Sequence, residues 1–245
     1  MLFRIALALA GLAALAQQQN SDTVDLDAPV LQQHAANLYF QAPAISGDIV
    51  QRLKELGAYA IQQGISTEGI DYEILPGLPA LPLDLSMPAS LLRGLQRDTC
   101  SSDAIMIGNV TDQQSHFTST RESVYTDYAF TVQKTLKGTP AKRIVLTRRG
   151  GAIKNIASGG PLTSFSLTDD SYPNLKPNTT YLLFLTRISA TGAYTAPDPF
   201  VGTLVNDTNK RQWMFVPMTN SQFVLPELAE STFEANIAGW LNACH

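Results

Sequence analysis

Histidine and cysteine are scarce in this chain, and their scarcity limits the metal chemistry that it can carry. The 245 residues include three histidines, His34, His116 and His245, and two cysteines, Cys100 and Cys244. A structural zinc site needs four ligands in a tetrahedron. Cys244 and His245 are adjacent, with no further histidine or cysteine near them in the sequence, so they make a poor zinc site. We expect no metal and no other cofactor.

The chain also lacks the short motifs of common enzyme classes. It has no phosphate-binding loop, no dinucleotide fingerprint, no His-Glu-x-x-His sequence and no Gly-x-Ser-x-Gly elbow. Two weaker arrangements remain. His116 could act as a base for Ser115 beside Asp112, and Asp169 with Asp170 could bind calcium or act as paired carboxylates. An exposed loop histidine and a solvated turn explain these residues better, so we expect a protein that is not an enzyme.

No excess of basic residues is present. Lys and Arg number 17 against 21 Asp and Glu, which gives a net charge of −4. Nucleic-acid binding usually requires a basic face or stripe, so we expect no nucleic-acid partner. The one basic cluster joins Arg148 and Arg149 to Lys142, Arg143 and Lys154. It is typical of the solvated rim of a hairpin, with an anion-binding or partner-binding rim as the alternative.

Long apolar runs are absent except near the amino terminus. Arg4 is followed by the apolar run 5–16 and then by the polar residues 17–20, a pattern that predicts a signal peptide cleaved after Ala16. A spanning helix needs roughly 20 apolar residues, more than this run supplies, so an uncleaved anchor is the weaker alternative. Cleavage would remove one base and change the charge from −4 to −5. We therefore expect a secreted protein, extracellular or periplasmic, with no membrane span after cleavage.

Four segments follow the expected signal peptide at residues 1–16. Residues 17–44 are polar without apolar periodicity, which predicts a flexible amino-terminal segment. Residues 45–99 begin with an expected helix of about 15 residues, which Ser46 or Asp48 can cap and Gly64 can stop. Its apolar face comprises Ile49, Leu53, Leu56, Ala60 and Ile61. An extended segment with four prolines at 70–88 and a short helix at 89–97 follow. Residues 100–225 form the expected barrel, and residues 226–245 hold a carboxy-terminal helix.

Apolar residues alternate with a period of two after Cys100. Residues 104–110 predict a buried strand with a bulge or bend at Gly108, and residues 124–133 predict a long, half-buried antiparallel strand. Further strands are expected at 143–149, 181–185, 193–196, 212–216 and 222–224, while 150–177 is expected to be mostly loop. Antiparallel strands without a βαβ rhythm predict a mainly β fold. We expect an OB-like antiparallel β-barrel, or a sandwich, with an N-terminal helix and a C-terminal helix packed on it.

Export to an oxidising compartment would allow Cys100 and Cys244 to form a disulfide. The bridge would close a loop of 244 − 100 + 1 = 145 residues, for which the chain-entropy model gives a stabilisation on the order of 5 kcal/mol. The alternative is two free or partner-linked thiols, because connectivity does not follow from sequence alone.

Three stretches of this region carry a family likeness. They are Cys100-Ser-Ser-Asp-Ala-Ile-Met-Ile-Gly-Asn-Val110, Tyr128-Ala-Phe-Thr-Val-Gln-Lys-Thr-Leu-Lys-Gly138 and Leu175-Lys-Pro-Asn-Thr-Thr-Tyr-Leu-Leu-Phe-Leu185. Together with Gly150-Gly151 they resemble the netrin module and the inhibitory domain of the tissue inhibitors of metalloproteinases, including bacterial secreted relatives. The resemblance covers about residues 100–205 and implies an OB fold.

The resemblance also raises metalloprotease inhibition as an alternative function. In those inhibitors a cysteine at the mature amino terminus chelates the protease zinc through its free amino group and carbonyl. Cys100 lies 100 − 16 = 84 residues after the expected cleavage site, and the other cysteines of the family framework are absent. An internal amide nitrogen is no usable donor to zinc, so this mechanism would require cleavage directly before Cys100.

The sequence thus predicts a secreted, non-enzymatic binding module whose ligand it does not identify. On an OB-like barrel the connecting loops are the usual binding surface. We therefore expect contacts with a protein or another extracellular ligand on the loops at 116–123 and 150–172. The expected partner-binding residues are His116, Phe117, Arg148, Arg149, Asp169, Asp170 and Tyr172.

Overall fold

The computed structural model describes residues 25–28, 31, 48–64, 66, 72–74, 88–118, 120–157, 159–167, 174–196, 203–208, 211–215 and 228–244. The expected signal peptide, the expected strand at 222–224 and the expected site residues Asp169, Asp170 and Tyr172 lie outside them. The described elements, in chain order, are α3 (Ile49–Gln62), β1 (Tyr72–Ile74), α4 (Pro88–Ser101), β2 (Ala104–Phe117), β3 (Val124–Lys137), β4 (Arg143–Arg149), β5 (Gly151–Ile153), β6 (Phe165–Leu167), β7 (Thr180–Arg187), β8 (Tyr194–Thr195), β9 (Thr203–Asp207), β10 (Gln212–Phe215), β11 (Leu228–Ala229) and α5 (Glu230–Ala243).

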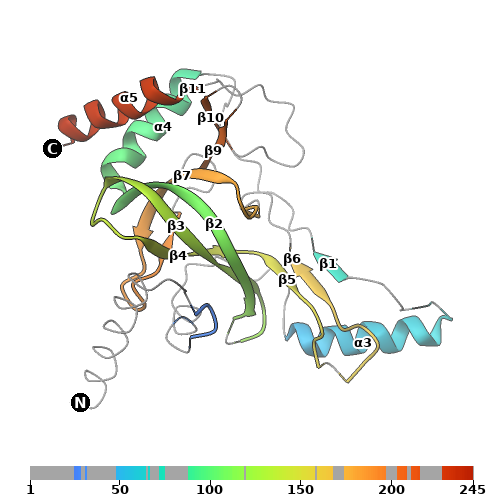
Figure 1. Cartoon of the computed structure of the whole chain (residues 1–245). Helices are drawn as coiled ribbons and strands as arrows, with labels where there is room; N and C mark the ends of the chain where they lie inside the picture. The colour runs from blue at the N-terminus through green and yellow to red at the C-terminus, as the bar shows by residue number, and fades with distance from the viewer. Residues whose placement is uncertain are drawn as a thin grey trace, which may run out of the picture.

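The fold is mainly β, as the sequence predicts, with helices before and after the long strands (Figure 1). One sheet has the strand order β11-β10-β9-β7-β2-β3-β4-β8, and a smaller one has the order β1-β6-β5. In the larger sheet β8 also pairs with β7, so the pairings lead from β7 through β2, β3, β4 and β8 back to β7. The last two steps are short: Leu146 of β4 pairs in parallel with Tyr194, and two residue pairs join β7 to β8.

The antiparallel pair β2–β3 is the longest strand pair among the described residues, and its pairing is irregular. Its register shifts at three places, one of them between Ile107 and Gly108. A Cβ atom on Gly108 would lie 2.0 Å from the carbonyl oxygen of Thr131, so only glycine allows the two backbones to approach this closely. The predicted irregularity at Gly108 is therefore confirmed.

Two apolar clusters pack on opposite faces of the larger sheet. One contains Tyr128, Phe130, Leu146 and Leu183 and is enclosed by β2, β3, β4 and β7. The other places Trp213 and Phe233 between β2, β7, β9 and β10 and the helices α4 and α5. Because Phe233 and Ile237 recur at helical spacing, α5 presents one apolar stripe to this cluster.

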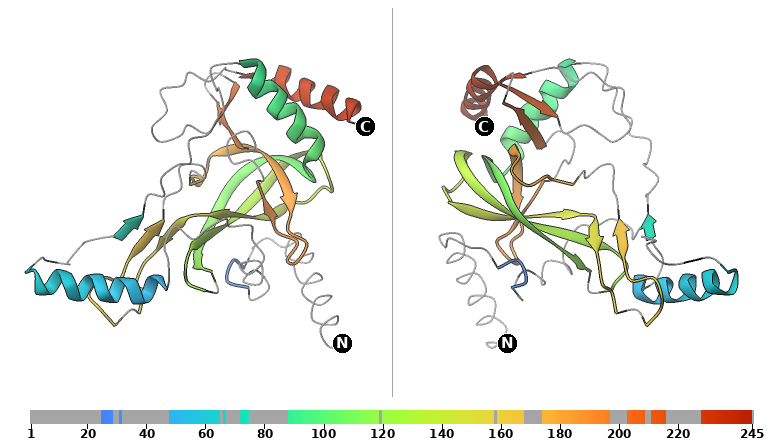
Figure 2. Two further views of the ribbon diagram at one scale, coloured as in Figure 1. Left: turned by 180° about the vertical axis from the view of Figure 1, so that it is seen from behind. Right: turned by 45° about the vertical axis from the view of Figure 1, so that its right-hand side comes forward.

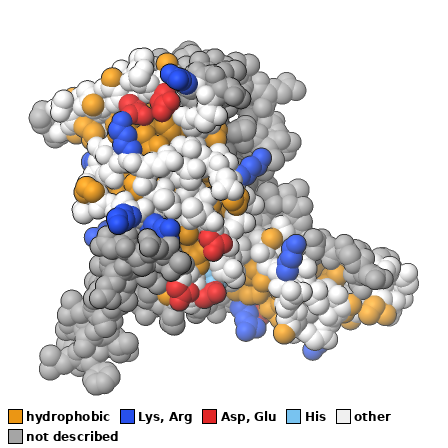
Figure 3. All heavy atoms as spheres, viewed as in Figure 1, with side chains coloured by type: hydrophobic (Ala, Val, Ile, Leu, Met, Phe, Trp, Pro, Cys, Tyr) orange, Lys and Arg blue, Asp and Glu red, His pale blue; other side chains and the backbone are white. Residues whose placement is uncertain are grey.

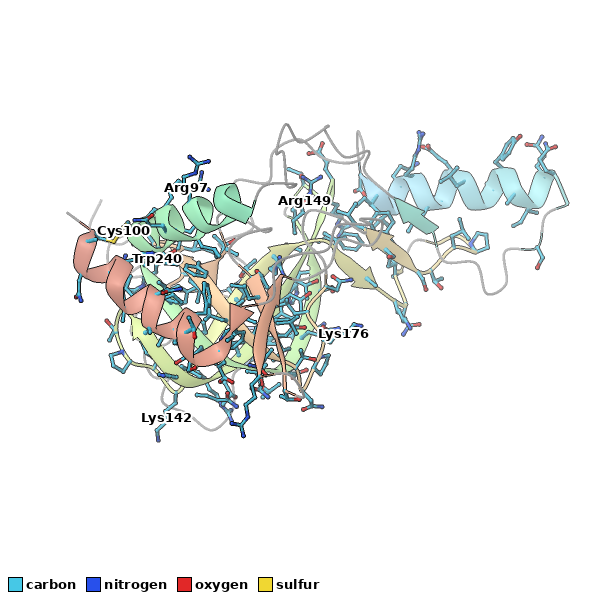
Figure 4. The ribbon with its side chains drawn as sticks, turned by 90° about the horizontal axis from the view of Figure 1, so that it is seen from above. Arg97, Cys100, Lys142, Arg149, Lys176 and Trp240 are labelled. Atoms are coloured by element: carbon cyan, nitrogen blue, oxygen red, sulfur yellow. A yellow bond between two sulfur atoms is a disulfide. The ribbon has the colours of Figure 1, made fainter. Side chains whose placement is uncertain are left out.

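A disulfide joins the ends of α4 and α5, which lie side by side in Figures 1 and 2. The Cα atoms of Cys100 and Cys244 are 5.4 Å apart, so the predicted pairing is confirmed. The ammonium group of Lys137 on β3 donates to the carbonyl oxygens of Thr99 and Cys100, at 2.9 and 2.8 Å, and so satisfies the end of α4. Figure 4 shows Cys100 and Trp240 at this junction.

The remaining elements form an arm that extends away from the larger sheet (Figure 2). We define the arm as α3, the β1-β6-β5 sheet and the loops at 118–123 and 154–164. Helix α3 begins after Asp48, whose side chain accepts hydrogen bonds from the backbone nitrogens of Val50 and Gln51. The predicted helix is thus confirmed, and Asp48 is the cap among the two predicted candidates, Ser46 and Asp48; Ser46 lies outside the described residues. Residues 150–177, expected to be mostly loop, contain β5 and β6, because β6 gains a parallel partner in β1.

The other elements differ from the predictions mainly in length. The short helix expected at 89–97 continues to Ser101, and β2, expected to end at Val110, continues to Phe117. β3 is buried on both faces over Val124–Phe130, whereas its alternation predicts one solvated face. The second face is covered by residues that precede α3: Leu26, Ala28 and Leu31 pack with Ala129 of β3 and Val145 of β4. The segment 17–44, expected to be flexible, therefore includes residues with a defined packing site.

Candidate functional site

The two loops expected to bind a partner meet in the arm. Phe117, at the end of β2, packs in one apolar cluster with Ile156 and Phe165 from the second loop region and with Ile49 and Leu53 of α3. Three segments of the chain, separated by at least 156 − 117 = 39 residues, thus share one small core. The sequence predicts both loops, and the structure shows that α3 packs against both of them.

Backbone contacts fix α3 against both loops. The backbone nitrogen of Ile49 donates to the carbonyl oxygen of Arg121 at 2.9 Å. Further along the helix, a Cβ atom on Gly57 would lie 2.6 Å from the ring of Pro161, so the helix and the second loop approach as closely as glycine permits. Thr118 and Ser123 close the first loop through a backbone hydrogen bond of 2.9 Å. The arm is therefore a built surface with defined loop positions.

The outer half of α3 exposes two large apolar side chains. Tyr59 and Ile61 are each 60% exposed, although the first half of the same helix buries Ile49 and Leu53. Hydrophobic side chains are visible along the arm in Figure 3. Because they are two positions apart on the helix, the two side chains leave different sides of α3. The sequence pattern did not single out Tyr59, and it placed Ile61 on the apolar, packed face of the helix, whereas Ile61 is exposed.

His116 lies in a strand rather than in a loop. It pairs with Tyr125 across β2–β3, because β2 extends beyond the predicted end. Its imidazole stacks on the ring of Tyr125 with the ring centres 5.4 Å apart, and its Nε2 atom lies 3.8 Å from Oδ2 of Asp127. Phe117, the next residue, points to the other face and joins the arm cluster. His116 and Phe117 therefore lie in different surroundings, His116 against Tyr125 and Phe117 in the arm cluster.

Asp127 is the most unusual residue near His116, since it is a completely buried carboxylate. Its Oδ1 accepts a hydrogen bond of 2.5 Å from the hydroxyl of Thr147 on β4. Burial raises the pKa of the neighbouring Tyr125, and the charge of Asp127 raises that pKa further. Sequence analysis did not single out Asp127, although a lone carboxylate among apolar and aromatic residues of a strand was the available signal.

The two arginines differ in their surroundings. The sequence predicts that Arg148 lies on a solvated rim, and this prediction is wrong, because the residue is only 2% exposed. Its strand position puts it beside Thr126, and its charge lowers the pKa of Tyr128, although burial has the larger, opposite effect on that pKa. Arg149 is half-buried and pairs with Tyr125. Figure 4 shows Arg149 between the larger sheet and α3.

Ser115 and His116 lie on opposite faces of β2 and do not form a catalytic pair. The Ser115 hydroxyl is 2.9 Å from that of Thr126, which in turn donates to the carbonyl oxygen of Gly150. Asp112 accepts a hydrogen bond from the backbone nitrogen of Gln113 next to it. The geometry that a hydrolase based on His116 and Ser115 would require is therefore absent at these three residues.

Two features are absent from the residues that the structure describes. Among them, no group of three or more His, Cys, Asp or Glu side chains is placed to hold a metal ion. In the same part of the chain no helix has the length and apolarity that crossing a membrane requires.

Comparison with known proteins adds no relative. No protein-family model, no curated protein and no solved structure matches this chain.

Proposed function

We propose that this protein is an exported, non-enzymatic binding module built on a closed barrel of the OB type. The barrel is supported by the order of strand pairings. β2 pairs with β3, β3 with β4, β4 with β8 and β8 with β7, and β7 closes the ring by pairing with β2. Four of these steps are antiparallel, and β4–β8 is parallel. A five-stranded barrel of this kind presents its loops and one strand face to ligands. The proposal keeps the likeness to the netrin module as a hypothesis about fold.

Export is supported by the Cys100–Cys244 disulfide, because such bonds persist in oxidising compartments. Metalloprotease inhibition by zinc chelation receives no comparable support. Cys100 lies inside α4 and is bonded to Cys244, so its nitrogen is an internal amide of a helix.

The arm is the proposed binding surface, and a protein is the proposed partner. The observation that carries this assignment is that α3 packs against both loops and carries Tyr59 and Ile61, each 60% exposed, beyond that contact. Tyr, Trp and Arg side chains are the usual anchors of protein interfaces, and Tyr59 is of this kind. Arg52, Lys54, Arg121 and Lys154 add exposed positive charge around the same elements.

A capture experiment with matched variants tests the proposal. The protein is immobilised and exposed to extracellular fluid from its source, in three forms: wild type, Tyr59→Ser with Ile61→Ser, and Ala235→Ser with Ala238→Ser. The last pair changes exposed positions of α5 and is the control. We expect a protein that is retained by the wild type and the control but lost by the arm variant. Equal retention by all three forms, or no retention above an empty support, would refute the proposal.

A further inference from the structure

A second surface of the molecule is covered by its own chain. We call residues 25–28 and Leu31 the strap. Leu26, Ala28 and Leu31 are buried, with Leu31 completely so, and they pack against Ala129 of β3, Val145 of β4 and Ala193. In both views of Figure 2 the strap, in blue, lies beside the turn that joins β7 to β8. The side chains of Ala129 and Val145 point away from the cluster that contains Tyr128 and Phe130, so the strap lies on the outer face of these strands.

The strap is held by apolar contact. Its hydrogen bonds among the described residues are local: the nitrogens of Ala28 and Leu31 donate to the carbonyl oxygens of Asp25 and Ala28, and the nitrogen of Asp27 donates to the Asp25 side chain. These bonds fold the strap into turns and do not join it to β3 or β4. Two leucines and an alanine are thus the whole described attachment, and such a contact can exchange with another ligand of the same shape.

The covered face has the character of a shallow apolar site. Ala129, Val145 and Ala193 are small, which leaves room for a leucine side chain above them. The next pair on the same face of the two strands is Asp127 and Thr147, whose hydrogen bond closes the site on one side with a polar boundary. β3 and β4 are the second and third strands of the proposed five-stranded barrel, and in OB folds this is the strand face that takes ligands.

We propose that this face is a peptide-binding site and that the strap is its internal occupant. The ligand class is a short peptide that places two aliphatic side chains on one side of a turn, as Leu26 and Leu31 do. The inference deepens the proposed function and rests on it, but it concerns a different surface from the arm. Because the strap is covalently tethered, its effective concentration at the site is on the order of millimolar, so a free peptide must compete with it.

Peptide binding to the full chain tests this inference. The probe is a fluorescent synthetic peptide with the sequence of residues 24–33, and the variant is Leu26→Asp with Leu31→Asp, which places two charges where the face is apolar. We expect fluorescence anisotropy to show that this opened variant binds the peptide at least about tenfold more tightly than the wild type does. Asp27→Asn, at an exposed strap position, should bind as weakly as the wild type.

Controls separate binding from misfolding. Circular dichroism and a urea midpoint establish that the opened variant is folded, and a peptide carrying the same two Asp substitutions should bind neither protein. A folded opened variant that does not bind the wild-type peptide overturns the inference. The inference is also overturned if the wild type is a dimer and the opened variant is a monomer. In that case the strap of one copy would bind the face of a second copy. Either result leaves the arm experiment intact, because neither the α3 variant nor its α5 control changes the strap or the face that it covers.

Discussion

Thr147 donates a 2.5 Å hydrogen bond to Oδ1 of Asp127, and both residues are completely buried. A buried carboxylate is costly unless donors compensate it, so the pair ties β3 to β4 at a position where an apolar pair would be expected. Thr147→Val keeps the shape of the side chain and removes the donor. We expect the free energy of unfolding to fall by roughly 1–3 kcal/mol.

Urea unfolding monitored by circular dichroism measures the effect of Thr147→Val. Thr139→Val is the matched control, because Thr139 is exposed in the turn after β3 and its replacement should change stability by less than about 0.5 kcal/mol. If both substitutions have the same small effect, the hydrogen bond to Asp127 contributes little.

The disulfide between α4 and α5 should contribute a large part of the free energy of unfolding. Cys100→Ser with Cys244→Ser opens a loop whose ends are 144 residues apart in the chain, and the loss of such a bond costs roughly 2–5 kcal/mol. The urea midpoint of the double variant should drop to that of the reduced wild type. A midpoint unchanged by both treatments would show that packing of Phe233 and Trp213 holds α5 without the bond.

Local patterns in the sequence predicted the elements that depend on local chemistry. Asp48 caps α3 because its side chain reaches the backbone nitrogens of Val50 and Gln51, and Gly108 marks the irregular pairing because only glycine fits there. The strand at Arg143–Arg149 also has its predicted bounds. In each case the information lies within a few residues of the feature.

Features that depend on distant contacts were missed. β6 exists because β1, which lies some 90 residues earlier in the chain, pairs with it, and neither strand has a strong pattern of its own. His116 lies in β2 because Tyr125 of β3 pairs with it, beyond the predicted end of the strand. The second buried face of β3 depends on Leu26 and Leu31, in a segment whose composition is polar. Alternation along one strand does not reveal what another segment lays over it.

Gly151 occupies a site that no other residue fits. Its φ is +135°, and a Cβ atom there would lie 2.1 Å from the Thr126 hydroxyl and 2.5 Å from that of Ser115. Gly151→Ala therefore strains the backbone and breaks the hydrogen bonds from Ser115 to Thr126 and from Thr126 to Gly150. We expect a loss of roughly 2–4 kcal/mol in the free energy of unfolding.

Gly159→Ala is the matched control for Gly151→Ala, because it strains the backbone without a clash. Gly159 also has a positive φ, +69°, but nothing lies within 4 Å of a Cβ atom built on it. Its replacement should cost about 1 kcal/mol. Equal losses for the two alanine variants in urea unfolding would show that the crowded hydroxyl pair does not matter.

Alkaline pH should destabilise the fold through three buried tyrosines. Burial raises the pKa values of Tyr125, Tyr128 and Tyr194 above the ordinary value of 10.0. Below pH 10 these phenols are neutral in the folded and the unfolded chain, and their contribution to stability is fully present. Above pH 10 the unfolded chain ionises first, so the free energy of unfolding falls as the pH rises and stops falling only above the folded-state pKa values.

Urea midpoints at pH 8 and pH 11, together with the ultraviolet absorbance of tyrosinate, measure this loss. Tyr125→Phe removes one ionising group and should make the difference between the two midpoints smaller than in the wild type. The absorbance should also rise on unfolding at pH 11, because unfolding ends the burial that raises the pKa of these phenols. A wild-type midpoint that is the same at both pH values would contradict the link between burial and ionisation.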